Sequence, residues 1–144
     1  MTHHRYTVHE SAPPADLAVV DAGIGAFNRL QPELDQVRAL AVFARDGAGA
    51  VAGGAVGRTW GECCELQQLW VRDADRGHGI GRQLMTLFEH EAARRGCRRA
   101  YLDSFSFQAP DFYRKLGYDV VLEVRGYTGG IARFTLHKAL GDGG

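Results

Sequence analysis

The feature that most constrains this chain is a run of alternating glycines, Arg76-Gly-His-Gly-Ile-Gly81, between an apolar strand and an amphipathic helix. The strand is expected from Glu62 to about Arg72. After the glycines, apolar side chains recur at helical spacing, at Leu84, Leu87, Phe88 and Ala92, with Met85 widening the stripe. Glycine lets a backbone approach a ligand closely, and the unpaired amides at a helix start attract negative charge. This arrangement therefore predicts a phosphate-binding turn.

Two common versions of such a turn fit poorly. A dinucleotide fingerprint requires Gly-x-Gly-x-x-Gly, whereas Gly77, Gly79 and Gly81 give Gly-x-Gly-x-Gly, and a hairpin precedes them instead of the first strand of a βαβ unit. A P-loop is excluded because the nearest match, Gly53–Thr59, has the wrong spacing and no lysine. Taken alone, the segment also remains compatible with a purely structural tight turn.

The rest of the chain predicts an α/β fold with a mixed, mostly antiparallel sheet flanked by helices, because strands joined by short turns must be antiparallel. Helices are expected from Pro13–Asp16 onward, after the glycine turn, and at Pro110–Leu116. Strands are expected at Arg5–His9, Val37–Arg45, Ala50–Arg58, Glu62–Arg72, Arg98–Ser104, Tyr118–Arg125 and Ile131–His137. No repeat or linker interrupts residues 1–144, so a single domain is expected.

Strict alternation along the strand before the glycine turn makes a prediction about its two faces. One face should carry Glu65, Gln67, Leu69 and Val71. The other face should carry Leu66, Gln68 and Trp70.

Charge and composition exclude several functions. Seventeen Lys and Arg balance seventeen Asp and Glu, so nucleic-acid binding is not expected. No apolar run approaches a membrane span and no signal peptide is apparent, which predicts a cytoplasmic protein without a membrane partner. The three cysteines, Cys63, Cys64 and Cys97, form no CxxC pair, so we expect buried, inert thiols and no metal site.

Two separated motifs together resemble the GNAT superfamily of N-acetyltransferases. Arg76, Gly79 and Gly81 match its acetyl-CoA-binding signature [Q/R]-x-x-G-x-[G/A]. Ala109-Pro-Asp-Phe-Tyr-Arg-Lys-Leu-Gly-Tyr118 is similar to its A-x-x-x-Y-x-K-x-G-[F/Y] motif, and the surrounding segment looks like an uncharacterised bacterial-type branch. The likeness extends from about Arg5 to Lys138. It implies transfer of an acetyl group from acetyl-CoA to a primary amine of a small molecule or peptide.

The resemblance also implies roles for individual residues. Tyr113 falls at the position of the general acid, and Glu65 at a position where some members carry a base. The backbone of Leu69, Trp70 and Val71 should pair with the pantetheine arm. The pyrophosphate should lie on the turn formed by Arg76, Gly77, His78, Gly79, Ile80, Gly81 and Arg82, with the His78 side chain toward solvent. Ser106 replaces an asparagine that contacts CoA in many relatives.

Two alternatives to an enzyme of this kind stay open at this point. One is a CoA-binding sensor or interaction module without useful catalysis, because the base is uncertain and Ser106 departs from the motif. The other is a nucleotide-binding oxidoreductase, against which the glycine spacing argues. The acceptor amine cannot be identified from the residues, and a homodimer is compatible with the neutral surface.

Overall fold

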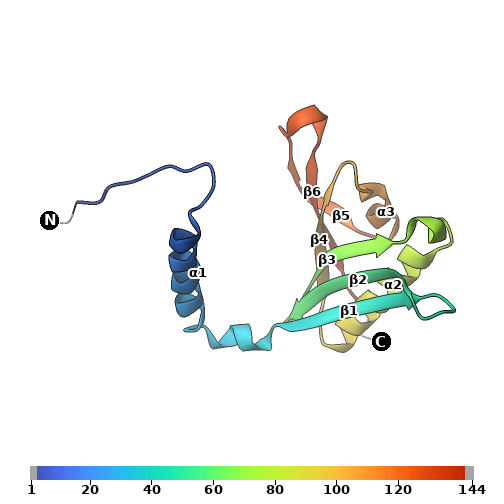
Figure 1. Ribbon diagram of the computed structural model, residues 1–144. Helices are drawn as coiled ribbons and strands as arrows, with labels where there is room; N and C mark the ends of the chain where they lie inside the picture. Colours follow the sequence, from blue (N-terminus) through green and yellow to red (C-terminus); the bar gives the residue numbers. More distant parts are fainter. Residues whose placement is uncertain (1–2, 142–144) are drawn as a thin grey trace. The chain divides into compact units, whose positions relative to one another are not determined.

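The computed structural model describes residues 3–141, which divide into two compact units (Figure 1). The first unit ends at Asp35 and the second begins at Gln36. Helix α1, Pro14–Asn28, lies in the first unit and begins with a proline, a residue whose fixed φ suits the first helical turn. The 3₁₀ turn η1, Pro32–Gln36, follows it.

The predicted strand at Arg5–His9 is wrong, because these residues carry no regular secondary structure. A strand requires a neighbour to satisfy its backbone groups. Among residues 3–141 the sheet contains six strands, and none of them pairs with Arg5–His9.

The second unit is built on a six-stranded sheet in the order β1-β2-β3-β4-β6-β5, which confirms the predicted mixed, mostly antiparallel architecture. Its strands are β1 (Arg38–Arg45), β2 (Val51–Trp60), β3 (Cys63–Val71), β4 (Arg99–Phe105), β5 (Asp119–Val124) and β6 (Arg133–Ala139). Only β3 and β4 are parallel. The crossover between them contains helix α2, Ile80–Arg94, and the shorter helix α3, Pro110–Lys115, connects β4 to β5. Two further 3₁₀ turns are η2, Asp73–Asp75, and η3, Thr128–Gly130.

Strands β3 and β4 pair over only four residues each. The ladder joins Cys63–Leu66 to Arg99–Leu102 and then stops, although both strands continue. The amides and carbonyls on the β4 side of β3 beyond Leu66 therefore have no partner on β4. This separation opens the sheet at its centre, directly before the glycine turn.

A β-bulge in β3 coincides with this opening. Val56 pairs with Gln68 while the next residue, Gly57, pairs with Leu66, so Gln67 is the extra residue. An added Cβ at Gly57 would lie 1.9 Å from the carbonyl oxygen of Glu65, which explains the glycine opposite the bulge.

The bulge overturns the prediction of two alternating faces along β3. Before it, Cys64 and Leu66 are buried, and after it the half-buried residues are Leu69 and Val71. Glu65 therefore does not share the face of Leu69, because an inserted residue shifts the alternation by one.

The core lies between this sheet and α2. Helix α2 buries Leu84, Met85, Phe88 and Ala92, whereas Leu87 is 44% exposed. The predicted apolar stripe is thus rotated by part of a turn, with Met85 inside and Leu87 at its rim. None of the described helices is long and apolar enough to span a membrane.

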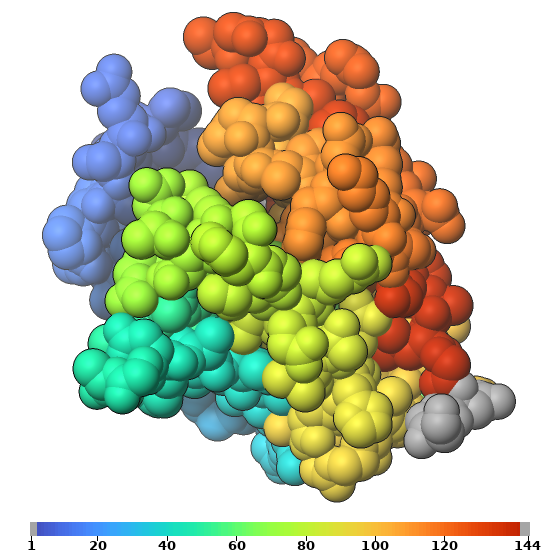
Figure 2. Space-filling view, turned by 90° about the vertical axis from the view of Figure 1, so that its right-hand side faces the viewer, coloured from blue at the N-terminus to red at the C-terminus, as the bar shows by residue number. Residues whose placement is uncertain are grey.

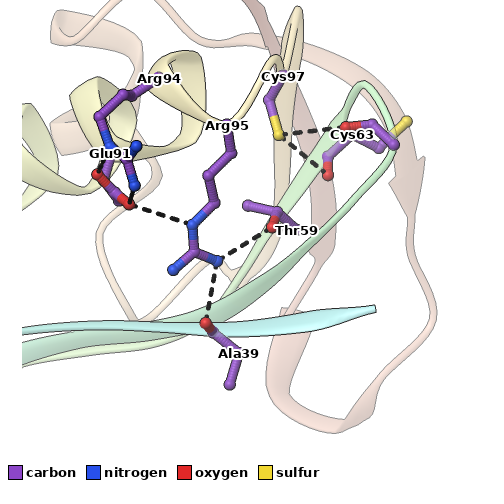
Figure 3. Close-up of polar contacts among 8 residues, drawn as sticks. Ala39, Thr59, Cys63, Glu91, Arg94, Arg95 and Cys97 are labelled. Atoms are coloured by element: carbon purple, nitrogen blue, oxygen red, sulfur yellow. Dashed lines mark hydrogen bonds and ion pairs between the residues drawn. The ribbon is translucent and has the colours of Figure 1, made fainter. Parts of the chain in front are cut away.

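Arg95 ties the end of α2 to the sheet (Figure 3). Its guanidinium donates from Nη1 to the carbonyl oxygen of Ala39 at 3.0 Å and to Thr59 Oγ1 at 3.1 Å, and from Nε to Glu91 Oε1 at 3.2 Å. Its side chain is only 13% exposed. Nearby, the buried Cys97 thiol donates to the backbone carbonyl of Cys63 at 3.5 Å. Cys64 is buried as well, whereas Cys63 is exposed, so the expectation of buried, inert thiols is wrong for Cys63.

Candidate active site

The glycine turn has the backbone geometry of an anion site. Gly77 and Gly79 have φ values of 82° and 78°, in the left-handed region that favours glycine. Gly79 is the N-cap of α2, and its carbonyl accepts the first helical bond, from the Gln83 amide at 3.0 Å. The amides of Ile80, Gly81 and Arg82 therefore have no acceptor within the helix and are available to a ligand.

A cleft of about 540 Å³ lies over this turn. One wall is the end of β3, Leu69–Val71, and the other comes from Gln108, Ala109 and Phe112 at the start of α3. The glycine turn forms its end, with Arg76, Gly77, Gly79, Ile80, Gly81 and Arg82. In Figure 2 the lime segment around residues 70–80 adjoins the light-orange segment around residues 105–115. The structure thus gathers nearly all predicted cofactor-binding residues around one cleft.

A glycine leaves room in this cleft between the start of α2 and Phe112. A Cβ on Gly81 would approach Phe112 Cζ to 3.3 Å, which is tighter than ordinary van der Waals contact. Arg76 lines the cleft while donating from Nε to the carbonyl of Val71 at 3.0 Å and from Nη1 to Asp73 at 3.3 Å. The pair with Asp73 is largely exposed, so it competes weakly with an anionic ligand.

Two predicted cofactor residues are not among those that line the cleft. The exposed His78 lies within hydrogen-bonding distance of the Asp75 carbonyl, at 3.2 Å, so only its backbone belongs to the turn. Ser106 is engaged with Ala132: its amide donates to the Ala132 carbonyl at 2.8 Å, and its Oγ accepts from the Ala132 amide at 3.0 Å. Its hydroxyl thus ties the end of β4 to the segment before β6.

Gln108 is a candidate cofactor residue that the sequence reasoning missed. It lines the cleft, and its Oε1 accepts from the Phe105 amide at 2.7 Å, which fixes the side chain and leaves two N–H donors for other partners. An available signal was its place directly before Ala109, the first residue of the second motif.

A second cavity, of about 180 Å³, lies where β3 and β4 separate, and we call it the splay cavity. It is lined by Leu66–Leu69 of β3, Leu102–Ser104 of β4, and Gln108, Ala109, Phe112 and Tyr113. Gln108, Ala109, Phe112 and Leu69 line both hollows. The cleft over the glycine turn and the splay cavity thus adjoin.

Tyr113 brings a phenol to the splay cavity. Its ring packs edge-on against Phe112 and Tyr118, with centroids 5.2 Å and 6.0 Å away. Burial raises the pKa of Tyr113 to about 12, so the hydroxyl is neutral at physiological pH and can donate a hydrogen bond. Tyr118 is held in turn by Glu89, whose Oε2 accepts from its hydroxyl at 3.0 Å and whose Oε1 accepts from Lys138 at 2.6 Å.

Glu65 lies in a different hollow, of about 120 Å³, with Arg58, Trp60, Cys63 and Tyr101. Its Oε2 accepts from Arg58 Nε at 2.9 Å. The structure therefore does not bring the two predicted catalytic side chains, Glu65 and Tyr113, into one cavity.

The charged residue that lines the splay cavity with Tyr113 is Asp103 on β4. Its Oδ1 accepts from Thr135 Oγ1 at 2.6 Å, and its Oδ2 accepts from Arg133. Asp103 lies at an exposed position of the alternating strand β4, where carboxylates are ordinary, so the local sequence carries no signal that it belongs to a site. Across residues 3–141, no group of three or more His, Cys, Asp or Glu side chains is placed to hold a metal ion.

Comparison with known proteins agrees with this geometry. The model of a family described as "Acetyltransferase (GNAT) family" matches residues 11–118. Blasticidin-S acetyltransferase of Streptomyces morookaense is 34% identical over 101 residues, which cover 69% of this chain and 74% of the relative. The acetyltransferase Atu2258 of Agrobacterium fabrum is 37% identical over 93 residues, 65% of this chain and 68% of that one.

The fold agrees as well. The crystal structure of an acetyltransferase from Bacillus cereus superimposes on this chain with a TM-score of 0.76 at 27% sequence identity. The superposition covers 93% of this chain and 98% of the Bacillus cereus chain.

Proposed function

Because the chain belongs to the GNAT family of acetyltransferases, we propose that it transfers the acetyl group of acetyl-CoA directly to a primary amine of a small molecule or peptide. It is accordingly an N-acetyltransferase. The observation that carries the proposed site is the continuity of two hollows: the cleft over the glycine turn adjoins the splay cavity that Tyr113 lines.

The cleft fits the elongated, anionic cofactor. The free amides of Ile80–Arg82 and the start of α2 suit a pyrophosphate, and Arg76 and Arg82 add positive charge. The unpaired edge of β3 at Leu69–Val71 suits the amides of a pantetheine arm, in the manner of an added strand. A ligand bound in this way would place its thioester at the splay cavity.

Bound acetyl-CoA supplies an acetyl thioester: the amine nitrogen bonds to the carbonyl carbon, and the carbon–sulfur bond breaks. Tyr113 donates a hydrogen bond to the departing sulfur. Its pKa of about 12 exceeds the ~8.5 of a thiol, so complete proton transfer to the thiolate is uphill by about 5 kcal/mol. Tyr113 therefore stabilises the thiolate chiefly by this bond, and the thiolate takes its proton from solvent.

The general base stays a prediction. Glu65 is ion-paired with Arg58 and lies two residues before Gln67, which lines the splay cavity. Two strand residues span about 7 Å. Glu65 thus acts through at least one water molecule if it accepts the proton of the amine.

The names of relatives suggest the kind of acceptor. A relative that is 34% identical is called blasticidin-S acetyltransferase, so a small-molecule amine is the first acceptor to test. A peptide amine, a cytoplasmic location and a homodimer remain predictions from the sequence.

The test is acetylation of an amine panel, beginning with blasticidin-S and including alkylamines, amino sugars and peptides. Mass spectrometry should detect a product heavier by one acetyl group, and thiol release should depend on the amine. If acetyl-CoA binds but no amine is acetylated, the chain is a CoA-binding module and the proposed activity is refuted.

A further inference from the structure

The described residues that line the splay cavity carry one negative charge and no positive charge. Among the described residues that line it, Asp103 is the only one with a charged side chain, beside the neutral amides of Gln67, Gln68 and Gln108 and the phenol of Tyr113. Asp103 is paired with Arg133, which is not among the residues that line the splay cavity. The hollow around Glu65 differs, because Arg58, the partner of Glu65, lines the same hollow. A positive group is therefore favoured in the splay cavity and a negative group is disfavoured.

Asp103 is ionised and accessible. Its partial burial raises the pKa of its carboxyl, but the hydrogen bonds from Thr135 and Arg133 outweigh this effect, and the net pKa is lowered. The ion pair with Arg133 is nearly half exposed on both sides, at 44% and 45%, and such pairs contribute little. A ligand cation in the cavity can replace Arg133 at this carboxylate at small cost.

We propose that Asp103 is the specificity-determining residue for the acceptor: it binds the nucleophilic amine in its ammonium form and rejects amines that carry a neighbouring carboxylate. This inference rests on the proposed function, because the ammonium must meet the thioester in the splay cavity. Alkylamines and amino sugars are thereby favoured over the α-amine of free amino acids.

The proton balance is simple. The ammonium bound at Asp103 loses one proton to water, and Asp103 stays ionised throughout. The neutral amine then attacks the carbonyl carbon, the carbon–sulfur bond breaks, and Tyr113 donates its hydrogen bond to the thiolate. The second amine proton leaves with the formation of the amide, and the thiolate acquires one proton from solvent.

The alternative is that Asp103 only ties β4 to β6 through Thr135 and Arg133. A test must therefore read the charge preference of the cavity itself, without knowledge of the natural acceptor. Three CoA thioethers of similar size meet this need: S-aminoethyl-CoA, S-propyl-CoA and S-carboxymethyl-CoA. They share the CoA portion and differ in the charge that they place beside the sulfur.

Calorimetric affinities of the full chain and three variants form the experiment. In the unaltered protein we expect S-aminoethyl-CoA to bind roughly five to ten times more tightly than S-propyl-CoA, and S-carboxymethyl-CoA to bind most weakly. Asp103→Asn should bring the three affinities to within about twofold. Arg133→Gln, which removes the ion pair at Oδ2 of Asp103, should enlarge the ammonium preference. Asp119→Asn, a matched change at an exposed carboxylate on β5, should preserve it.

The outcomes separate the two claims. Equal affinities in the unaltered protein, or a preference that survives in Asp103→Asn, would overturn the inference while the CoA site stands. Failure of all three thioethers to bind would refute the proposed function and the inference with it. If Asp103→Asn does not fold, the enlarged preference of Arg133→Gln supports the inference, and an unchanged preference overturns it.

Discussion

Replacement of Tyr113 by phenylalanine removes one hydroxyl and little else. The ring contacts with Phe112 and Tyr118, at 5.2 Å and 6.0 Å between centroids, are available to phenylalanine, so the fold should persist. A hydrogen bond to a charged acceptor contributes about 1.5–3 kcal/mol. We therefore expect Tyr113→Phe to lower kcat by roughly 10- to 150-fold, with little change in the KM for acetyl-CoA.

The assay is thiol release at saturating amine, measured from pH 6 to pH 11. Since burial raises the pKa of Tyr113 to about 12, its ionisation should not lower the rate below about pH 11. The ratio of the rate of the unaltered protein to the rate of Tyr113→Phe should therefore be constant from pH 6 to pH 11. An unchanged kcat would refute the role of Tyr113. A descending limb near pH 9–10 that vanishes in the variant would instead refute the raised pKa of its hydroxyl.

Three further predictions concern stability. Arg95→Met removes the charged donor to Ala39 and Thr59, and we expect the free energy of unfolding in urea to fall by about 2–4 kcal/mol. Hydrogen bonds from Arg94 and Arg95 lower the pKa of Glu91 from an ordinary 4.5 to about 2. The free energy of unfolding should therefore fall as the pH drops from about 4.5 to 2, and it should fall less steeply in Glu91→Gln. Gly57→Ala places a Cβ on the β3 backbone and should cost at least about 2 kcal/mol, seen as a lower melting temperature.

Matched controls sharpen these three tests. Arg94→Met removes a side chain that is 65% exposed and should change stability by less than about 0.5 kcal/mol. Gly47→Ala, where an added Cβ meets nothing within 4 Å, should be almost neutral. Losses as large in the controls as in the test variants would contradict the account, and so would an acid transition that Glu91→Gln leaves unchanged.

The order of elements in the second unit was predictable because each one carries a local signal. Hairpin turns, the glycine run and the period of α2 each locate a boundary within a few residues. The Arg5–His9 strand failed because a short alternating segment does not reveal whether a neighbouring strand exists to pair with it.

The candidate site was predictable where a motif fixes the backbone, as at Gly77–Arg82. It was not predictable where side chains depend on tertiary pairing. The bulge at Gln67 shifts every later side chain of β3 to the opposite face, and nothing in the local sequence marks it except Gly57 on the neighbouring strand. Asp103 enters the site only because β3 and β4 separate beside it.

The central claim is that the glycine turn holds the phosphates of acetyl-CoA, and calorimetric titration with acetyl-CoA tests it most directly. The variant Gly79→Asp puts a carboxylate beside the free amides of the turn. The control Gly49→Asp puts the same residue in a hairpin turn outside the cleft, where the φ of Gly49 is 86° and thus similar to the 78° of Gly79. The account predicts one saturable site in the unaltered chain and in Gly49→Asp, and at least tenfold weaker binding in Gly79→Asp. Equal binding by both variants, or no binding by the unaltered chain, would contradict it.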